Sequence, residues 1–244
     1  MPLPSVSTPK YELTVPSTKE VVKFRPFLVK EEKILLMASE SKDQKQVVNA
    51  LRDVLTGCIT SENKLDVMTL PTFDLQYIFL KLRAKSVGEV TELTVLCPEC
   101  ESVSPAEIDL GDVEVTFPEG HTKEIPITDE VGLVMRYPTF EMMESQKKVD
   151  TGDIESVINV LSMCVDSIYD KDNIYTRKDY SDNDFKDFVY SLTQSDLTKM
   201  QQFFDTMPNM EHELKFMCTK CKEQQSVVLR SLDDFFTSDS ATSR

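Results

Sequence analysis

Two pairs of cysteines are the residues in this sequence whose types and spacing could do chemistry. Cys97 and Cys100 form one Cys-x-x-Cys motif, and Cys218 and Cys221 form a second. Each motif follows a short alternating run typical of a strand and precedes another strand-like run. The two-residue spacing lets both sulfur atoms of a tight turn face one ion, and four thiolates complete the tetrahedral shell that zinc prefers. We therefore predict one structural zinc ion per chain.

Over a hundred residues separate the two motifs, whereas paired motifs are usually separated by about 12–20 residues. This separation weakens the match to a compact zinc ribbon but not the chemistry, because a long segment costs little closure entropy once it folds. Disulfides, independent thiols and a thioredoxin-like redox pair are the alternatives. A redox pair needs its motif at the start of a helix, whereas the residues after Cys100 and Cys221 indicate turns and strands. A catalytic zinc is disfavoured because four thiolates leave no open position.

Composition narrows the function classes. The 244 residues fit one or two domains, and 27 basic against 42 acidic residues give a net charge of −15. Such a charge repels phosphate backbones, so it disfavours nucleic-acid binding. No apolar run approaches the roughly 20 residues of a membrane span, and the N-terminal residues lack the basic flank and apolar core of a signal peptide. We therefore expect a reducing compartment, where thiols are more often metal ligands than disulfides.

Residues for catalysis are sparse. The chain has six glycines and no phosphate-cradling loop, and no nucleophile motif accompanies its two histidines. We expect His121 to be exposed in a turn, whereas His212, six residues before Cys218, could stack near the zinc. Cys58 and Cys164 lie in apolar helical stretches and are expected to be buried as small hydrophobic residues. These observations favour a binding or assembly protein over an enzyme, with no catalytic residues.

The elements that must position the cysteines predict an α+β fold. Apolar spacing predicts seven helices, over residues 29–39, 43–56, 70–85, 139–149, 154–168, 182–192 and 196–207. Alternation predicts a β-hairpin over 11–15 and 21–25 and further strands beside the cysteines and at 113–117, 124–127 and 131–137. Pro126 should place its strand at a sheet edge. Ser181, and either Thr193 or Ser195, should cap the last two helices.

These elements suggest five segments along the chain. They are a flexible arm at 1–10, a hairpin plus three-helix region at 11–90, a zinc-ribbon-like β region at 91–138 and 209–236, a helical insert at 139–208 and a tail at 237–244. In this organisation the insert lies between the two cysteine motifs.

The N-terminal third resembles a known family. The run Tyr-Glu-Leu-Thr-Val-Pro-Ser-Thr from Tyr11, followed by Val-Lys-Phe-Arg-Pro-Phe-Leu-Val-Lys-Glu-Glu-Lys from Val22, is similar to baseplate hub subunit and hub assembly proteins of T-even-type bacteriophages. The resemblance is dense over about residues 3–60. It implies a non-enzymatic role in building the baseplate hub with other hub proteins, in the host cytoplasm during assembly or in the virion tail baseplate. The family has no catalytic motif to transfer.

A basic patch near this run is a candidate partner-binding site. Lys23, Arg25 and Lys30 stand at a hairpin-to-helix junction in an otherwise acidic chain. The alternative is that the neighbouring Pro26 and Phe27 simply turn the chain into the core. Two other functions remain open: a zinc-ribbon regulator contacting nucleic acid or the transcription machinery, which would lack its usual basic stripe, and a phage-encoded cell-wall hydrolase, which would need a carboxylate pair or an open zinc site.

Overall fold

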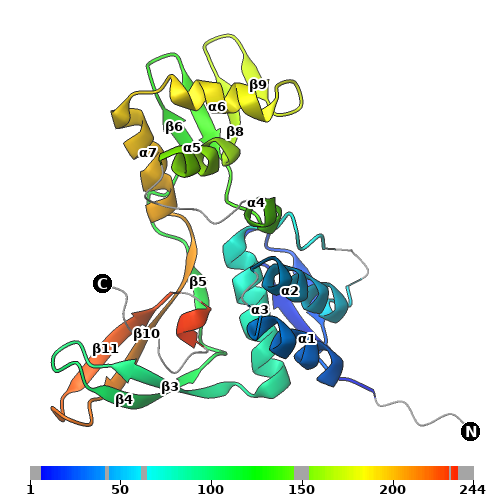
Figure 1. The fold of residues 1–244 in the computed structure, drawn as a ribbon, viewed down its shortest axis with the longest axis vertical. Helices are drawn as coiled ribbons and strands as arrows, with labels where there is room; N and C mark the ends of the chain where they lie inside the picture. Colours follow the sequence, from blue (N-terminus) through cyan, green and yellow to red (C-terminus); the bar gives the residue numbers. More distant parts are fainter. Residues whose placement is uncertain (1–6, 42–43, 62–64, 146–153, 231, 236–244) are drawn as a thin grey trace, which may run out of the picture. The chain divides into compact units, whose positions relative to one another are not determined.

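The structure is a computed structural model that describes residues 7–41, 44–61, 65–145, 154–230 and 232–235. These residues form the α+β fold predicted from the sequence, with helices and small antiparallel sheets (Figure 1). The chain divides into two compact units, of which the first comprises Met1–Thr116 and Asn209–Arg244 and the second Phe117–Pro208. No helix among the described residues is long and apolar enough to cross a membrane. The first six residues of the expected arm, and the tail at 237–244, lie outside the described part.

The first unit begins with the predicted β-hairpin. Strands β1 (Tyr11–Thr14) and β2 (Val21–Phe24) pair antiparallel. Three helices follow: α1 (Val29–Ser39), α2 (Gln44–Cys58) and α3 (Thr72–Val87). The third supplies much of the core, because its side chains from Phe73 to Ala84 include eight buried residues. All three helices therefore occur where the apolar spacing predicts them, within a few residues at their ends.

The apolar face expected for α1 is only partly buried. Ala38 is 7% exposed, but Ile34 and Leu36 are 39% and 59% exposed. The side of α1 that faces inward instead carries Glu31, which accepts a hydrogen bond from Arg25 at 2.9 Å. An ion pair thus occupies part of the space that the helical stripe was expected to fill.

The remaining strands of the first unit form two small sheets. Strands β3 (Val90–Leu96) and β4 (Val103–Asp109) make an antiparallel hairpin. A three-stranded sheet has the order β11-β10-β5, with β5 at Glu114–Thr116, β10 at Asn209–Met217 and β11 at Gln224–Leu229. A short 3-10 helix, η1, follows at Asp233–Phe235. Thr116, the last residue of the first segment of this unit, is paired in register with Asn209, the first residue of its second segment.

The described residues of the second unit form a four-stranded antiparallel sheet and four helices. The strand order is β6-β7-β8-β9, over Glu124–Pro126, Gly132–Met135, Val165–Tyr169 and Ile174–Thr176. The helices are α4 (Phe140–Ser145), α5 (Ile154–Met163), α6 (Asp182–Tyr190) and α7 (Gln194–Asp205). As predicted, Pro126 lies in an edge strand. The predicted caps are also present, since the side chains of Ser181 and Thr193 accept hydrogen bonds from backbone N–H groups of α6 and α7.

Two predictions in this unit are wrong. The helix expected over 154–168 ends at Met163, and Val165 begins strand β8. The strands at 124–126 and 132–135, expected within the zinc-ribbon-like β region at 91–138, instead join the sheet of β8 and β9. Both errors concern pairing between distant segments, which alternation along one segment does not specify. The end of the helix predicted over 139–149 lies outside the described residues.

Candidate metal centre

The two cysteine motifs occupy two turns of the same geometry. The first joins β3 to β4, where the Cys97 N–H donates to the Ser102 carbonyl at 2.9 Å and the Glu101 N–H to the Cys97 carbonyl at 2.9 Å. The second joins β10 to β11, and Cys218 makes the corresponding bonds, to the Glu223 carbonyl at 3.0 Å and from the Lys222 N–H at 3.1 Å.

The residue after each motif adopts a left-handed conformation. The φ angle is 55° at Glu101 and 61° at Lys222. This conformation reverses the chain directly after the second cysteine, so that both sulfur atoms of each motif remain on one side of the turn. Neither position carries the glycine that usually signals such a turn, which is why the sequence does not reveal it.

The four sulfur atoms converge, although the two motifs are far apart in sequence. The Sγ atoms all lie within 4.8 Å of one another. Cys97 and Cys221 are 3.8 Å apart, and Cys100 and Cys218 are 3.6 Å apart. A zinc ion with tetrahedral bonds of about 2.3 Å would separate its sulfur ligands by about 3.8 Å. The donor set and its spacing therefore fit a four-thiolate metal site.

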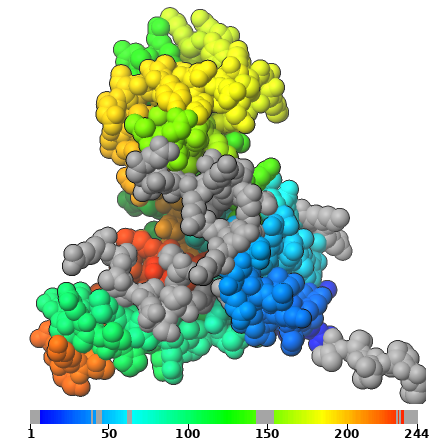
Figure 2. Space-filling model, in the orientation of Figure 1, coloured from blue at the N-terminus to red at the C-terminus, as the bar shows by residue number. Residues whose placement is uncertain are grey.

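Burial and packing are consistent with a closed site. Cys97 and Cys218 are fully buried, whereas Cys100 and Cys221 are half-buried. The tip of the β10–β11 hairpin, orange in the space-filling view, lies against the β3–β4 hairpin, green (Figure 2). All four potential ligands are thiols, so an ion held by all of them would have no open position for a substrate.

Two serines complete the surroundings of the sulfur atoms and were not identified from the sequence. The Ser102 hydroxyl lies 3.0 Å from the Cys100 sulfur and 3.3 Å from that of Cys218. Ser104 is fully buried, and its hydroxyl donates to Cys218 at 3.8 Å and accepts from the Thr219 N–H at 3.0 Å. In the sequence, only their positions two and four residues after Cys100 indicate that these serines could lie near the sulfur atoms.

These contacts favour an ionised sulfur. The hydrogen bond from the Ser102 hydroxyl, together with those from the N–H groups of Cys221 and Lys220, lowers the pKa of Cys218 to about 5. A thiolate is the form that binds metal. The turn thus supplies hydrogen-bond donors to the atom that a cation would also stabilise.

The alternatives for the cysteines can be compared with this geometry. A thioredoxin-like motif begins a helix, but here both motifs connect antiparallel strands. The other two cysteines take no part. Cys58 is 0% and Cys164 1% exposed, and burial raises the pKa of each thiol to about 11, so both behave as the buried hydrophobic residues that were predicted.

The structure gives the two histidines different surroundings from those expected. His121 is not a freely exposed loop residue, because its ring stacks on Tyr137 and packs against Phe203. Its Nδ1 atom lies 3.0 Å from the Thr206 hydroxyl, and burial lowers its pKa. His212 lies on β10 opposite Leu229, five register positions before the last pair of the hairpin. Neither histidine belongs to the four-cysteine cluster.

The predicted basic patch divides into exposed and internal groups. Lys23 and Lys30 are exposed and form ion pairs with Glu12 at 3.4 Å and Glu31 at 3.3 Å. The Arg25 side chain is only 15% exposed, and it bonds to Glu31 and to the Gly57 carbonyl. Arg25 thus ties the hairpin to α1 and α2, and the two lysines are the members of the patch that a partner could reach.

One family model matches this chain. It is described as T4 bacteriophage base plate protein, and it matches residues 8–237. The match includes both β-hairpins that carry the cysteines and the whole second unit. No curated protein and no solved structure matched the chain.

Proposed function

Because the chain belongs to the T4 bacteriophage base plate protein family, we propose that it is a non-enzymatic subunit or assembly protein of the baseplate hub. Membership establishes a structural role in the phage baseplate, and hence an association with the virion tail. The assignment to the hub rests on the similarity of residues 3–60 to hub proteins. Its partners are then other hub proteins, which it first meets in the host cytoplasm during assembly.

The observation that carries the non-enzymatic part is the closed donor set of Cys97, Cys100, Cys218 and Cys221. Among the described residues, these cysteines form the group of potential ligands close enough to hold a metal ion. Four thiolates suit a structural zinc, one per chain, that joins two hairpins and leaves no site for a substrate. Zinc in this proposal stabilises the fold, and binding occurs at the protein surface.

Surface residues available for that binding include Lys23 and Lys30. Both are exposed, and they provide positive charge on a chain whose net charge is −15. We assign Arg25 to the same candidate surface because its guanidinium fixes the junction from which the two lysines project. Opposite charges across an interface mainly set the partner and the association rate.

Affinity purification from phage-infected cells tests the function. A tagged chain should recover other baseplate proteins in fixed ratios, and its yield of them should fall at higher salt if charged contacts contribute. A chain with Lys23→Glu and Lys30→Glu should recover less of at least one partner, whereas Lys178→Glu, an exposed change in the second unit, should not. Recovery of no tail protein by the unaltered chain would refute the proposed function.

A further inference from the structure

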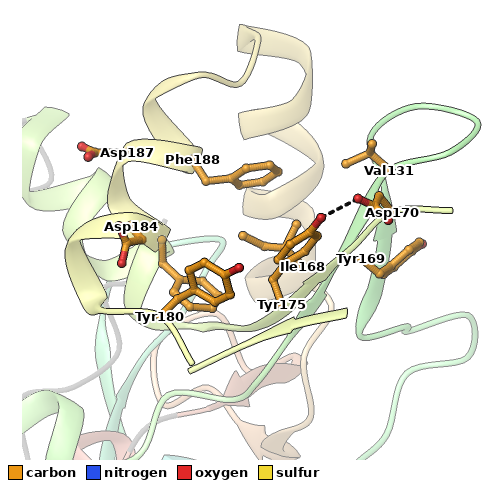
Figure 3. A pocket seen from close by; sticks show the side chains of 10 residues that line it. Val131, Ile168, Tyr169, Asp170, Tyr175, Tyr180, Asp184, Asp187 and Phe188 are labelled. Carbon is orange, nitrogen blue, oxygen red and sulfur yellow. Dashed lines mark hydrogen bonds between the residues drawn. The ribbon is translucent and has the colours of Figure 1, made fainter. Parts of the chain in front are cut away.

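A second surface feature lies in the other unit, away from the cysteines and the basic patch. A cleft of about 440 Å³ opens between α6, strands β8 and β9 and the residue before β7. Its size falls within the range of about 300–1,000 Å³ that is typical of ligand sites. Figure 3 shows the rings of Tyr175, Tyr180 and Phe188 around this hollow, with Ile168 at its base. Five of the ten residues that line the cleft are aromatic.

Carboxylates stand on two sides of these rings. Asp184 and Asp187 come from α6, with their carboxylates on the outer side of the helix beside the hollow, and Asp170 directly follows β8 (Figure 3). The residues that line the cleft include these three aspartates and neither lysine nor arginine. An aromatic hollow with only negative charges at its rim is complementary to a cation.

The three aspartates are not equally available. Asp170 is satisfied internally, since it accepts hydrogen bonds from the Tyr175 hydroxyl at 2.6 Å and from two backbone N–H groups. One oxygen of Asp184 caps α6 through Ser181. The exposed carboxylate of Asp187 accepts no hydrogen bond from the described residues. The acceptor capacity that remains for a ligand thus lies on the α6 side, at Asp184 and Asp187.

Two basic residues close to the cleft, Arg177 and Lys186, already have partners. The Arg177 guanidinium lies 4.4 Å from the centre of the Phe185 ring and bonds to Asp182 and to backbone carbonyls. Lys186 pairs with Glu155 at 2.5 Å. Because Arg177 covers Phe185, an incoming cation should sit nearer to Tyr180 and Phe188 than to Phe185.

We propose that this cleft receives an arginine side chain from a basic segment of a partner protein. Arginine fits better than lysine, because a planar guanidinium can stack on Tyr180 or Phe188 while its N–H groups reach Asp184 and Asp187. Tyr180 is 45% exposed, so the hollow is accessible from the surface. The net charge of −15 attracts basic partners generally. That the partner is a protein rests on the proposed function.

The chemistry can be tested on the full chain by NMR titration with a capped Gly-Arg-Gly tripeptide. The signals of Ile168, Val131 and the residues of α6 should shift and saturate. The matched tripeptide with citrulline, which has the same shape without the charge, should produce no saturable shift, and the lysine tripeptide should bind more weakly. Equal binding of the citrulline form, or tighter binding of spermidine than of the arginine tripeptide, would overturn the inference.

Two variants and a control test whether the arginine tripeptide binds in this cleft. Asp187→Asn and Tyr180→Leu should each weaken arginine tripeptide binding at least fivefold, while Glu119→Gln, an equal loss of charge elsewhere in the second unit, should leave it unchanged. In purification from infected cells, the Asp187→Asn, Tyr180→Leu double variant should lose a baseplate protein that Glu119→Gln retains. If it retains every partner, the cleft is not a docking site, although the proposed function stands. If even the unaltered chain recovers no baseplate protein, the proposed function fails.

Discussion

Single residues show how the first unit uses charge inside its core. Glu31 is 4% exposed, and Arg25, the Leu28 N–H and Lys30 all contact its carboxylate. Burial would raise its pKa, but the hydrogen bonds from Arg25 and Leu28 outweigh burial and lower it from 4.5 to about 2. The carboxylate is therefore ionised in the folded chain and fastens α1 to the hairpin.

This network predicts a pH dependence. The folded pKa of Glu31 lies below its unfolded value, so its contribution to stability is complete above pH 4.5 and is lost as the pH falls towards 2. Glu31→Gln should lower the free energy of unfolding at pH 7 by about 1–3 kcal/mol. Urea unfolding at a series of pH values should show that the difference in free energy of unfolding between Glu31→Gln and the unaltered chain becomes smaller below pH 4.5. Glu32→Gln, on the exposed side of α1, should leave the free energy of unfolding unchanged. A difference for Glu31→Gln that became larger in acid would contradict the lowered pKa of Glu31.

Ser104 offers a test of the surroundings of the sulfur atoms. Its hydroxyl serves both the Cys218 sulfur and the Thr219 N–H. Residues that orient metal ligands typically contribute about 10–100-fold to metal affinity, so Ser104→Ala should weaken zinc binding by about tenfold or more. Competition with a chelator measures this, and Ser226→Ala, an exposed change on β11, is the control. Equal affinities in the two variants would show that Ser104 only fills space.

Among the helices and strands, features set by neighbouring residues could be predicted from the sequence, whereas pairings between distant segments could not. The Cys-x-x-Cys turns, the cap at Ser181 and the edge position of Pro126 depend on neighbouring residues, and each was predicted correctly. For α7 the sequence left Thr193 and Ser195 as alternatives, and Thr193 is the cap. The end of α5 depends on distant groups: Arg136 donates to the Met163 carbonyl at 3.0 Å, and Arg177 to the Ser162 carbonyl. Those two arginines satisfy the end of the helix, so no glycine or proline marks it.

The residues of the candidate site also fall into those that the sequence identifies and those that only the fold brings together. The four cysteines could be identified from type and spacing alone. Ser102 and Ser104 could not, because serines are common in turns and only the approach of the second hairpin brings them to Cys218. The aromatic cleft was also missed, since it combines Tyr175 and Tyr180 with α6, and only the folded chain brings these residues together.

The left-handed conformation of Lys222 leads to a prediction about stability. Lys222 has a φ of 61°, a region that costs an L-residue roughly 1–2 kcal/mol and a β-branched residue more. Lys222→Val should therefore be less stable than Lys222→Gly by about 1 kcal/mol or more. Thermal unfolding of the zinc-loaded chain compares the two. Lys220→Val in the same turn, where φ is not positive, should have little effect, and a Lys222→Val chain as stable as the glycine variant would contradict the left-handed turn.

For the whole molecule, the chain connections explain how two distant motifs can meet. The second unit leaves the first after Thr116 and returns at Asn209, and these two residues are paired across β5 and β10. The second unit is thus an insertion between adjacent strand ends. Its length has little effect on the geometry of the cysteines, which explains why a separation of over a hundred residues does not prevent one site.

Removal of the insertion tests this connection. If residues 117–208 are replaced by Asn-Gly, a sequence suited to a tight hairpin, the shortened chain should fold and bind one zinc ion. Circular dichroism and metal analysis of the shortened chain would measure both properties. A shortened chain that is unfolded in the presence of zinc would show that the first unit needs the second.

We propose that one zinc ion at Cys97, Cys100, Cys218 and Cys221 holds the fold of this baseplate protein. Elemental analysis of the purified, dialysed protein measures the content of that ion. We predict one zinc per unaltered chain, none in Cys218→Ser, and one in Cys164→Ser, where a buried cysteine of the second unit is changed in the same way. Equal zinc content in the unaltered chain and Cys218→Ser would contradict the claim.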